Sequence, residues 1–289
     1  MNDILPTSRI PAGHPGREFV TGQTPFFACR ADQRFAYALY VPSSYREDGE
    51  PLGPLVAQHG TYRDAALYPT ALHEHAEQTH TAIMAPLFPA GIDDPNDLHN
   101  YKFIDYRGIR FDLVLLAMVE EVAARWHIRT DRFALHGFSG GGQFAHRFLL
   151  LHPDRLNAVS IGAPGRVTLP TSNETWWRGV GDLPQRFGIS LDPAAIARVA
   201  IQLLIGEEDS GGEELGSVEQ DGAGADRQQR IRALQHALRE LGARPQLDIV
   251  PGAGHEPLPM IPALTRFLRS ASSARQEING PATRPAQRK

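Results

Sequence analysis

A serine between glycines is the first sign of chemistry in this sequence. Residues 136–142 read His-Gly-Phe-Ser-Gly-Gly-Gly, so the pattern Gly137-x-Ser139-x-Gly141 lies between a strand pattern and a helix pattern. Side chains two residues before and after such a serine would collide in the sharp turn that exposes its Oγ. The N-terminus of the helix predicted directly after Ser139 would stabilise negative charge that develops beside the serine during a reaction. The pattern predicts Ser139 as a nucleophile; the alternative is a glycine-rich turn that only packs a helix.

This strand–turn–helix pattern resembles the nucleophile elbow of the α/β-hydrolase family. The resemblance spans roughly Thr24 to Ser270, and residues 136–142 are its most specific motif. It implies an α/β-hydrolase fold with a mostly parallel central sheet, helices on both faces and a small lid insertion. It also implies a catalytic triad in the chain order serine, acid, histidine.

The base should be a histidine, because a serine hydroxyl is weakly acidic. In the order of this family, only His236 and His255 follow a plausible acid. His236 lies in the middle of an amphipathic helix pattern, whereas His255 lies in a glycine-rich segment directly after the last strand pattern. We therefore expect His255 to be the base.

The acid should follow the preceding strand, where Glu207, Glu208 and Asp209 stand in a row. The family pattern of strand, glycine, two residues and then aspartate favours Asp209. Glu208 or Glu207 is the alternative, because a shift of the strand end changes which side chain faces His255.

An oxyanion hole needs two N–H donors. The first is the amide after the nucleophile, that of Gly140. The second should come from the loop after an earlier strand, which reads His59-Gly60-Thr61-Tyr62 and resembles the His-Gly loop of many family members. We expect Thr61 to supply the second N–H, Tyr62 to line the acyl pocket and His59 to brace the loop.

The elements that must position these residues alternate between strand and helix patterns. After a hairpin from residues 24–30 and 34–41, strand patterns cover residues 54–58, 82–86, 132–136, 156–161, 200–206 and 246–250. Helix patterns cover residues 65–79, 109–126, 141–152, 226–242 and 261–270. Such alternation predicts a mostly parallel sheet covered on both faces, with the site just after the strands.

Two long connections, residues 88–108 and 162–193, follow strands on the side of the expected site. The second is too short for a large cap domain, so we expect a small lid or rim. Its Trp176 and Trp177, with Phe138 of the elbow, could offer aromatic surface to a substrate. The alternative is that these tryptophans fill a satellite core beneath a long loop.

Composition excludes several classes of protein. The chain has 289 residues, a formal net charge of −4 and a single cysteine. These values argue against a nucleic-acid binder, an intramolecular disulfide and a zinc–thiolate site. No apolar stretch of about 18 residues could span a membrane. The acidic segment 207–226 lacks the spacing of an EF-hand calcium loop. The glycine-rich residues 140–145 partly match a dinucleotide-binding motif, but the acidic residue that this motif needs about 20 positions later is absent. We expect no metal and no cofactor.

These observations together predict a serine hydrolase that cleaves small-molecule carboxylic esters through an acyl-enzyme, similar to feruloyl esterases or polyester depolymerases. The alternatives are an amidase or peptidase with the same triad, and a non-catalytic small-molecule receptor on this scaffold. One hydrolase domain is expected over residues 24–270, after an irregular arm at 1–23 and before a disordered tail at 271–289. The N-terminus shows no secretory signal, so the expected location is the cytoplasm.

Overall fold

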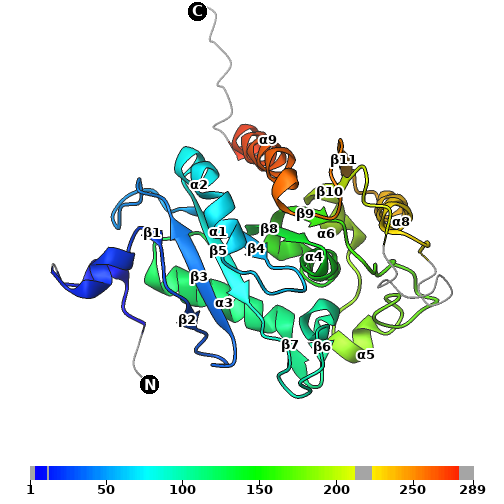
Figure 1. The fold of residues 1–289 in the computed structure, drawn as a ribbon, viewed down its shortest axis with the longest axis horizontal. Helices are drawn as coiled ribbons and strands as arrows, with labels where there is room; N and C mark the ends of the chain where they lie inside the picture. Colours follow the sequence, from blue (N-terminus) through cyan, green and yellow to red (C-terminus); the bar gives the residue numbers. More distant parts are fainter. Residues whose placement is uncertain (1–3, 12, 212–222, 280–289) are drawn as a thin grey trace, which may run out of the picture.

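A central sheet organises the protein (Figure 1). The computed structural model describes residues 4–11, 13–211 and 223–279. Within them, nine strands form one sheet in the order β1-β3-β5-β4-β8-β9-β10-β11, with β2 also paired to β3. The strands are β1 Gly22–Gln23, β2 Phe27–Ala28, β3 Ala36–Val41, β4 Gly53–Gln58, β5 Thr81–Leu87, β8 Phe133–Phe138, β9 Leu156–Gly162, β10 Ala200–Gly206 and β11 Gln246–Val250.

The direction of the strands confirms the predicted sheet. Neighbours from β5 through β4, β8, β9 and β10 to β11 run parallel. The N-terminal strands β1 and β2 run antiparallel to β3, which is itself antiparallel to β5. The leading hairpin expected from the sequence is therefore present at one edge.

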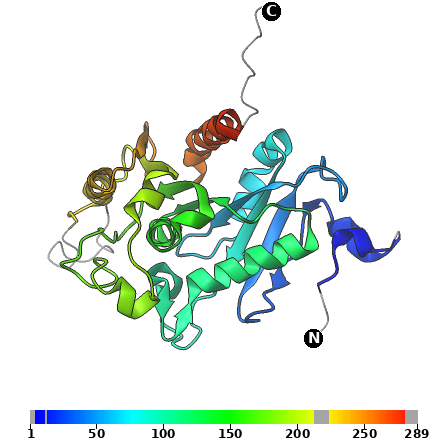
Figure 2. The same cartoon turned by 180° about the vertical axis from the view of Figure 1, so that it is seen from behind.

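Helices cover both faces of the sheet. They are α1 Leu67–Ala71, α2 His73–Thr79, α3 Phe111–Arg125, α4 Gly140–Leu151, α5 Leu183–Phe187, α6 Pro193–Ala197, α8 Arg227–Glu240 and α9 Ile261–Asn279. The two opposite views place α1, α2 and α9 on one side of the sheet and α3 and α4 on the other (Figures 1 and 2). Shorter elements are the 3-10 turns η1 Thr7–Arg9, η2 Pro15–Phe19, η3 Asn100–Phe103, η4 Pro153–Arg155 and η6 Leu258–Met260, and the small hairpin of β6 Asp105–Tyr106 and β7 Ile109–Arg110.

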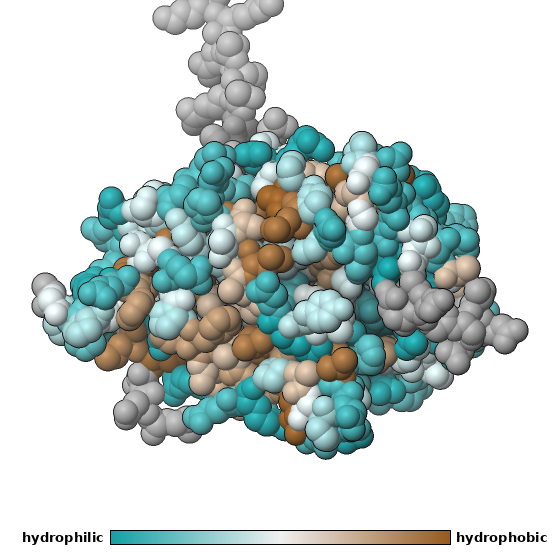
Figure 3. All heavy atoms as spheres, viewed as in Figure 1, coloured by the Kyte–Doolittle hydropathy of each residue, from teal (hydrophilic) through white to brown (hydrophobic). Residues whose placement is uncertain are grey.

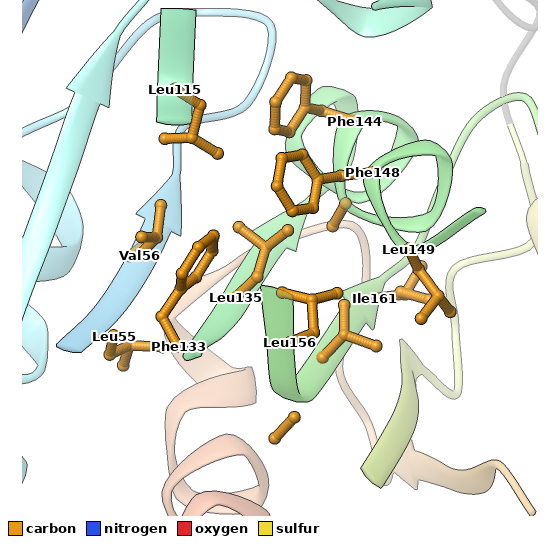
Figure 4. Close-up of a cluster of buried hydrophobic side chains, with 14 of the residues drawn as sticks. Leu55, Val56, Leu115, Phe133, Leu135, Phe144, Phe148, Leu149, Leu156 and Ile161 are labelled. Carbon is orange, nitrogen blue, oxygen red and sulfur yellow. The ribbon is translucent and has the colours of Figure 1, made fainter. Parts of the chain in front are cut away.

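The core is densest around α4, the helix that follows the serine. Every residue of α4 is buried, as expected for a helix that is apolar on most sides. In Figure 4, Phe144 and Phe148 of α4 point toward Leu115 of α3 and toward Phe133 and Leu135 of β8. Because this helix is enclosed all round, its N-terminus is held firmly against the strand ends.

Two of the predicted helices differ from the structure by an interruption or by more than two residues at an end. The helix expected at 65–79 is divided into α1 and α2 at Leu72, where Tyr68 and Leu72 are both buried and packing decides the local backbone. The tail expected to be disordered from residue 271 is helical as far as Asn279, because no glycine or proline interrupts the helix before Gly280. The rest of that expected tail, residues 280–289, lies outside the described residues.

The N-terminal arm, expected to be irregular, contains the short elements η1, η2 and β1. The carbonyl of Val20 accepts a hydrogen bond from Nε1 of Trp126 at 3.0 Å, which fastens the arm to the end of α3. Leu5, Phe19 and Phe26 are exposed apolar side chains of this part of the chain. On the face shown in Figure 3, hydrophobic residues gather toward the lower left, where Figure 1 draws β1 to β3. Among the described residues, no helix is long and apolar enough to cross a membrane.

Candidate active site

The elbow between β8 and α4 depends on close backbone packing. Ser139 has a φ of 56°, in the left-handed region that most residues avoid. A Cβ on Gly137 would collide with the carbonyl of Gly141, and one on Gly141 would collide with the carbonyls of Gln58 and His59 at the end of β4. Glycines therefore allow the sharp turn that presents Ser139 at the end of a central strand.

The structure brings Ser139, His255 and Asp209 together from three strand ends. Nε2 of His255 lies 2.9 Å from Oγ of Ser139, and its Nδ1 lies 2.6 Å from Oδ2 of Asp209. An ionised carboxylate only accepts hydrogen bonds, so Nδ1 carries the proton and donates to Asp209. Nε2 is then the acceptor for the serine hydroxyl. The His255 side chain is 29% exposed and that of Asp209 is 1% exposed, so the carboxylate is shielded from solvent while the imidazole is partly accessible.

Among the three consecutive carboxylates, only Asp209 is buried. Glu207 and Glu208 are exposed, and Oε2 of Glu207 accepts a hydrogen bond from the backbone N–H of Gly252. The Arg227 guanidinium donates to Oδ1 of Asp209 at 3.2 Å from a position that is 4% exposed. Arg227 was not predicted from the sequence. A signal existed, because it is the first residue of α8, where the helix dipole disfavours a cation that lacks an acidic partner.

The two expected oxyanion-hole residues lie in contact. A Cβ on Gly140 would be 3.1 Å from the backbone nitrogen of Thr61. Next to them, Nε2 of the fully buried His59 accepts from the amide of Phe88 at 3.0 Å, so its Nδ1 donates to the carbonyl of Gly60 at 2.8 Å. Burial lowers the pKa of His59 to about 3. This imidazole is therefore neutral and braces the loop.

Solved structures match this chain along most of its length, although no protein-family model and no curated protein matches the sequence. A poly(aspartic acid) hydrolase-1 from Sphingomonas sp. KT-1 is 22% identical, with 85% of this chain and 98% of that chain covered and a TM-score of 0.71. A poly(3-hydroxybutyrate) depolymerase from Bordetella parapertussis is 25% identical, with 83% and 87% covered and a TM-score of 0.66. An S-formylglutathione hydrolase from Agrobacterium tumefaciens is 18% identical, with 88% and 96% covered and a TM-score of 0.59.

The chain has the α/β-hydrolase fold. A ferulic acid esterase is a further match, with a TM-score of 0.61 over 87% of this chain. The predicted fold class is thereby confirmed.

The aromatic residues expected to contact substrate have different surroundings. Tyr62 is 99% exposed at the rim. Phe138 is 3% exposed, and its ring centroid lies 4.9 Å from that of His255, so it supports the imidazole. Trp176 is 8% exposed, packs against Phe187 and donates from Nε1 to the carbonyl of Phe103. Of the two interpretations of Trp176, its burial favours the satellite core.

Trp177, the second tryptophan of residues 162–193, is half-buried and lies near a buried guanidinium. Arg147 of α4 is 0% exposed, and its Cζ lies 5.3 Å from the Trp177 ring centroid and 5.2 Å from that of Phe103. Nε donates to Oγ1 of Thr168, and one terminal nitrogen donates to the carbonyl of Lys102 at 2.5 Å. Arg147 thus joins Thr168, Trp177 and η3 to α4, and no local pattern in the sequence indicated these contacts.

In the described part of the chain, no three or more histidine, cysteine or acidic side chains are grouped so that they could hold a metal ion. The acidic segment 207–226 falls largely at residues 212–222, outside the described residues.

Proposed function

We propose that this α/β-hydrolase is a serine hydrolase that cleaves carboxylic esters of small molecules through an acyl-enzyme, without a cofactor. The observation that carries the proposal is the pair of hydrogen bonds that runs from Asp209 through His255 to Ser139. This arrangement joins a nucleophile, a base and a group that orients the base, in the order such a reaction needs.

In the proposed reaction, Oγ of Ser139 attacks the ester carbonyl while Nε2 of His255 takes its proton. Asp209 holds the imidazole in the required tautomer and stabilises the imidazolium that forms. The N–H groups of Thr61 and Gly140 donate to the oxyanion of the tetrahedral intermediate. His255 then gives its proton to the leaving alcohol. Water, activated by the same imidazole, hydrolyses the acyl-enzyme.

An ester is the favoured bond. Of the solved structures compared, the poly(3-hydroxybutyrate) depolymerase is 25% identical to this chain, and the polymer in its name is a polyester. The same triad could hydrolyse amides or peptides, so the alternative is an amidase or peptidase. A non-catalytic receptor is the other alternative; it would not need the serine and histidine to lie 2.9 Å apart.

Active-site labelling tests the proposal directly. A fluorophosphonate probe should label the wild-type protein and not Ser139→Ala, because only an activated serine forms the covalent adduct. On 4-nitrophenyl esters, Ser139→Ala should lower kcat by about 10⁶-fold. Ser8→Ala, at an exposed position on the arm, is the matched control.

Two results would contradict the proposal: wild-type protein that stays unlabelled, or equal labelling of the Ser139→Ala variant. A parallel series of 4-nitroanilides separates ester from amide cleavage. Faster turnover of the anilides would move the proposal to the amidase alternative.

A further inference from the structure

A buried lysine lies against the proposed oxyanion hole and has no part in the mechanism above. Lys102 of η3 is 2% exposed, although lysine is among the residues least often buried. A Cβ on Gly140 would lie 2.9 Å from Cε of Lys102 and 3.1 Å from the nitrogen of Thr61. The lysine stem therefore packs on the same glycine that provides one oxyanion donor.

The ammonium of Lys102 reaches an exposed histidine. Nζ lies 2.8 Å from Nδ1 of His99, and an ammonium can only donate, so Nδ1 is the acceptor. Burial and the nearby charges of Lys102 and Arg166 lower the pKa of His99. In this neutral imidazole the proton is on Nε2, which makes Nε2 a hydrogen-bond donor of an exposed residue. The two side chains together offer donors to an incoming group.

One arginine ties this pair to the oxyanion loop. Arg63 follows Thr61 closely in the chain and donates to the carbonyls of Thr61 at 2.5 Å and Leu98 at 2.8 Å. It also donates to Oδ1 of Asn100 at 3.1 Å. The segment that carries His99 and Lys102 is thus fastened to the loop that carries the second proposed oxyanion donor. A ligand bound at the pair would be held in a fixed relation to Ser139.

The charges around Lys102 favour an anion there. Burial, together with the like charges of Arg63, Arg147 and Arg166, lowers the pKa of Lys102 to about 7. Asp97 is the carboxylate that acts in the opposite direction. A bound anion would favour the charged form of the lysine, because an opposite charge within hydrogen-bond distance raises the pKa of an ammonium. Binding of an anion would therefore take up a proton near neutral pH.

We propose that Lys102 and His99 form an anion subsite beside the oxyanion hole, and that it binds a carboxylate carried by the ester substrate. The proposal rests on the proposed function, since it names the substrate class of the same site. Toward an incoming ligand, the ammonium of Lys102 and Nε2 of His99 are both hydrogen-bond donors in this state, which suits a carboxylate and gives nothing to an uncharged alkyl chain.

Matched pairs of esters test the subsite. Mono-4-nitrophenyl glutarate and 4-nitrophenyl pentanoate differ in one terminal carboxylate on the acyl side, and 3-carboxyphenyl pentanoate and phenyl pentanoate differ in one on the leaving-group side. Lys102→Met keeps an unbranched apolar stem. For each pair we divide kcat/KM of the charged ester by kcat/KM of the neutral ester. Lys102→Met should lower this ratio by about tenfold in one pair, mainly because KM for the charged ester rises. The pair affected tells which side of the ester carries the carboxylate.

A control variant and a second variant keep the test decisive. Arg239→Met removes one exposed positive charge about 18 Å along α8 from Arg227 and should leave both ratios unchanged. His99→Leu acts at an exposed position, so it tests the subsite even if Lys102→Met fails to fold; it should lower the same ratio severalfold. The wild-type ratio should also fall as salt is raised.

The outcomes separate the subsite from the proposed function. The subsite alone is overturned if both ester types are still hydrolysed and the ratios in Lys102→Met and His99→Leu stay within about twofold of wild type. An equal loss on charged and neutral esters also overturns it, because the lysine would then act on the loop or the oxyanion. Absence of labelling and of any ester hydrolysis by the wild type would remove the proposed function and the subsite with it.

Discussion

The elbow and the rim of the candidate site are held in place in different ways. At the elbow, the glycines between β8 and α4 bring backbone against backbone, with no room for a Cβ at Gly137 or Gly141. At the rim, buried side chains hold the loops through long-range hydrogen bonds. Arg147 reaches Thr168 and the carbonyl of Lys102, and Arg63 reaches the carbonyl of Leu98.

This difference shows how one scaffold can keep its chemistry and change its substrates. An elbow built from backbone contacts is either formed or lost, because interiors packed at this density tolerate little change in volume. A rim held by individual side chains can be altered one contact at a time, at a cost of about 1–3 kcal/mol for each buried polar group left unsatisfied. We therefore expect changes at the strand ends to affect kcat or folding, and changes at the rim to affect binding and local stability.

After the loss of the nucleophile itself in Ser139→Ala, the largest effect is expected from Asp209→Asn. The amide would place the histidine in the wrong tautomer, so kcat on 4-nitrophenyl esters should fall about 10⁴-fold, which is about 5.5 kcal/mol of transition-state stabilisation. Glu208→Gln is the matched control, since Glu208 is exposed and adjacent in sequence. A larger loss in Glu208→Gln than in Asp209→Asn would move the acid to Glu208.

The next largest is the loss of stability in Gly137→Ala. The new methyl group would meet the carbonyl of Gly141 with no space to move into. We expect a loss of about 3 kcal/mol or more, or no folded protein at all. Gly53→Ala, in β4 of the same sheet, is the control, because a Cβ there meets nothing within 4 Å. Urea unfolding compares the two; equal midpoints would contradict the close packing proposed for the elbow.

The elbow was also the part of the site that the sequence predicted best. Its glycines stand at fixed spacing around Ser139, so a steric requirement appears as a local pattern. The parallel sheet was predictable for a similar reason, since each strand and helix carries its own periodicity. The prediction of Asp209 as the acid depended on where the preceding strand ends. In the structure, β10 ends at Gly206, and Asp209 is the buried one of the three consecutive carboxylates.

The contacts that hold the rim could not be predicted from the sequence in this way. The contacts of Arg147, Lys102 and Arg227 join residues up to 45 positions apart, and a single basic residue in a helix or loop is usually a solvated one. The helical continuation to Asn279 was missed for a different reason. Small and polar residues favour disorder by composition, but they do not stop a helix that packing has already started.

Arg147→Met tests the rim with a smaller effect. Loss of the guanidinium would leave the carbonyl of Lys102 and the hydroxyl of Thr168 without this donor in a buried place. We expect a loss of about 2 kcal/mol in unfolding free energy and a rise in KM for esters, with less change in kcat. Arg186→Met is the control, because its ion pair with Asp105 is partly exposed and worth about 0–1 kcal/mol. A fall in kcat at unchanged KM would show that Arg147 serves the elbow instead.

Per pH unit, the smallest effect is a pH dependence of the unfolding free energy that involves both regions. Burial lowers the pKa of His59 beside the oxyanion loop and of His136 in β8 to about 3. Unfolding returns each imidazole to a pKa of about 6.5, so between pH 6.5 and 3 the unfolded state binds a proton that the folded state does not. The stabilisation is complete above pH 6.5 and is lost as the pH falls, at about 1.4 kcal/mol per pH unit for each imidazole.

Urea unfolding between pH 7 and pH 5 measures this slope. His136→Phe removes one of the two groups and fits a ring beside Tyr68, whose centroid lies 5.0 Å from that of the imidazole. Its slope should be lower than that of wild type by about 1.4 kcal/mol per pH unit, with His236→Gln on the exposed face of α8 as control. Equal slopes for wild type and His136→Phe would mean that the elbow strand admits a proton without unfolding. That result would contradict the proposed difference between a rigid elbow and an adjustable rim.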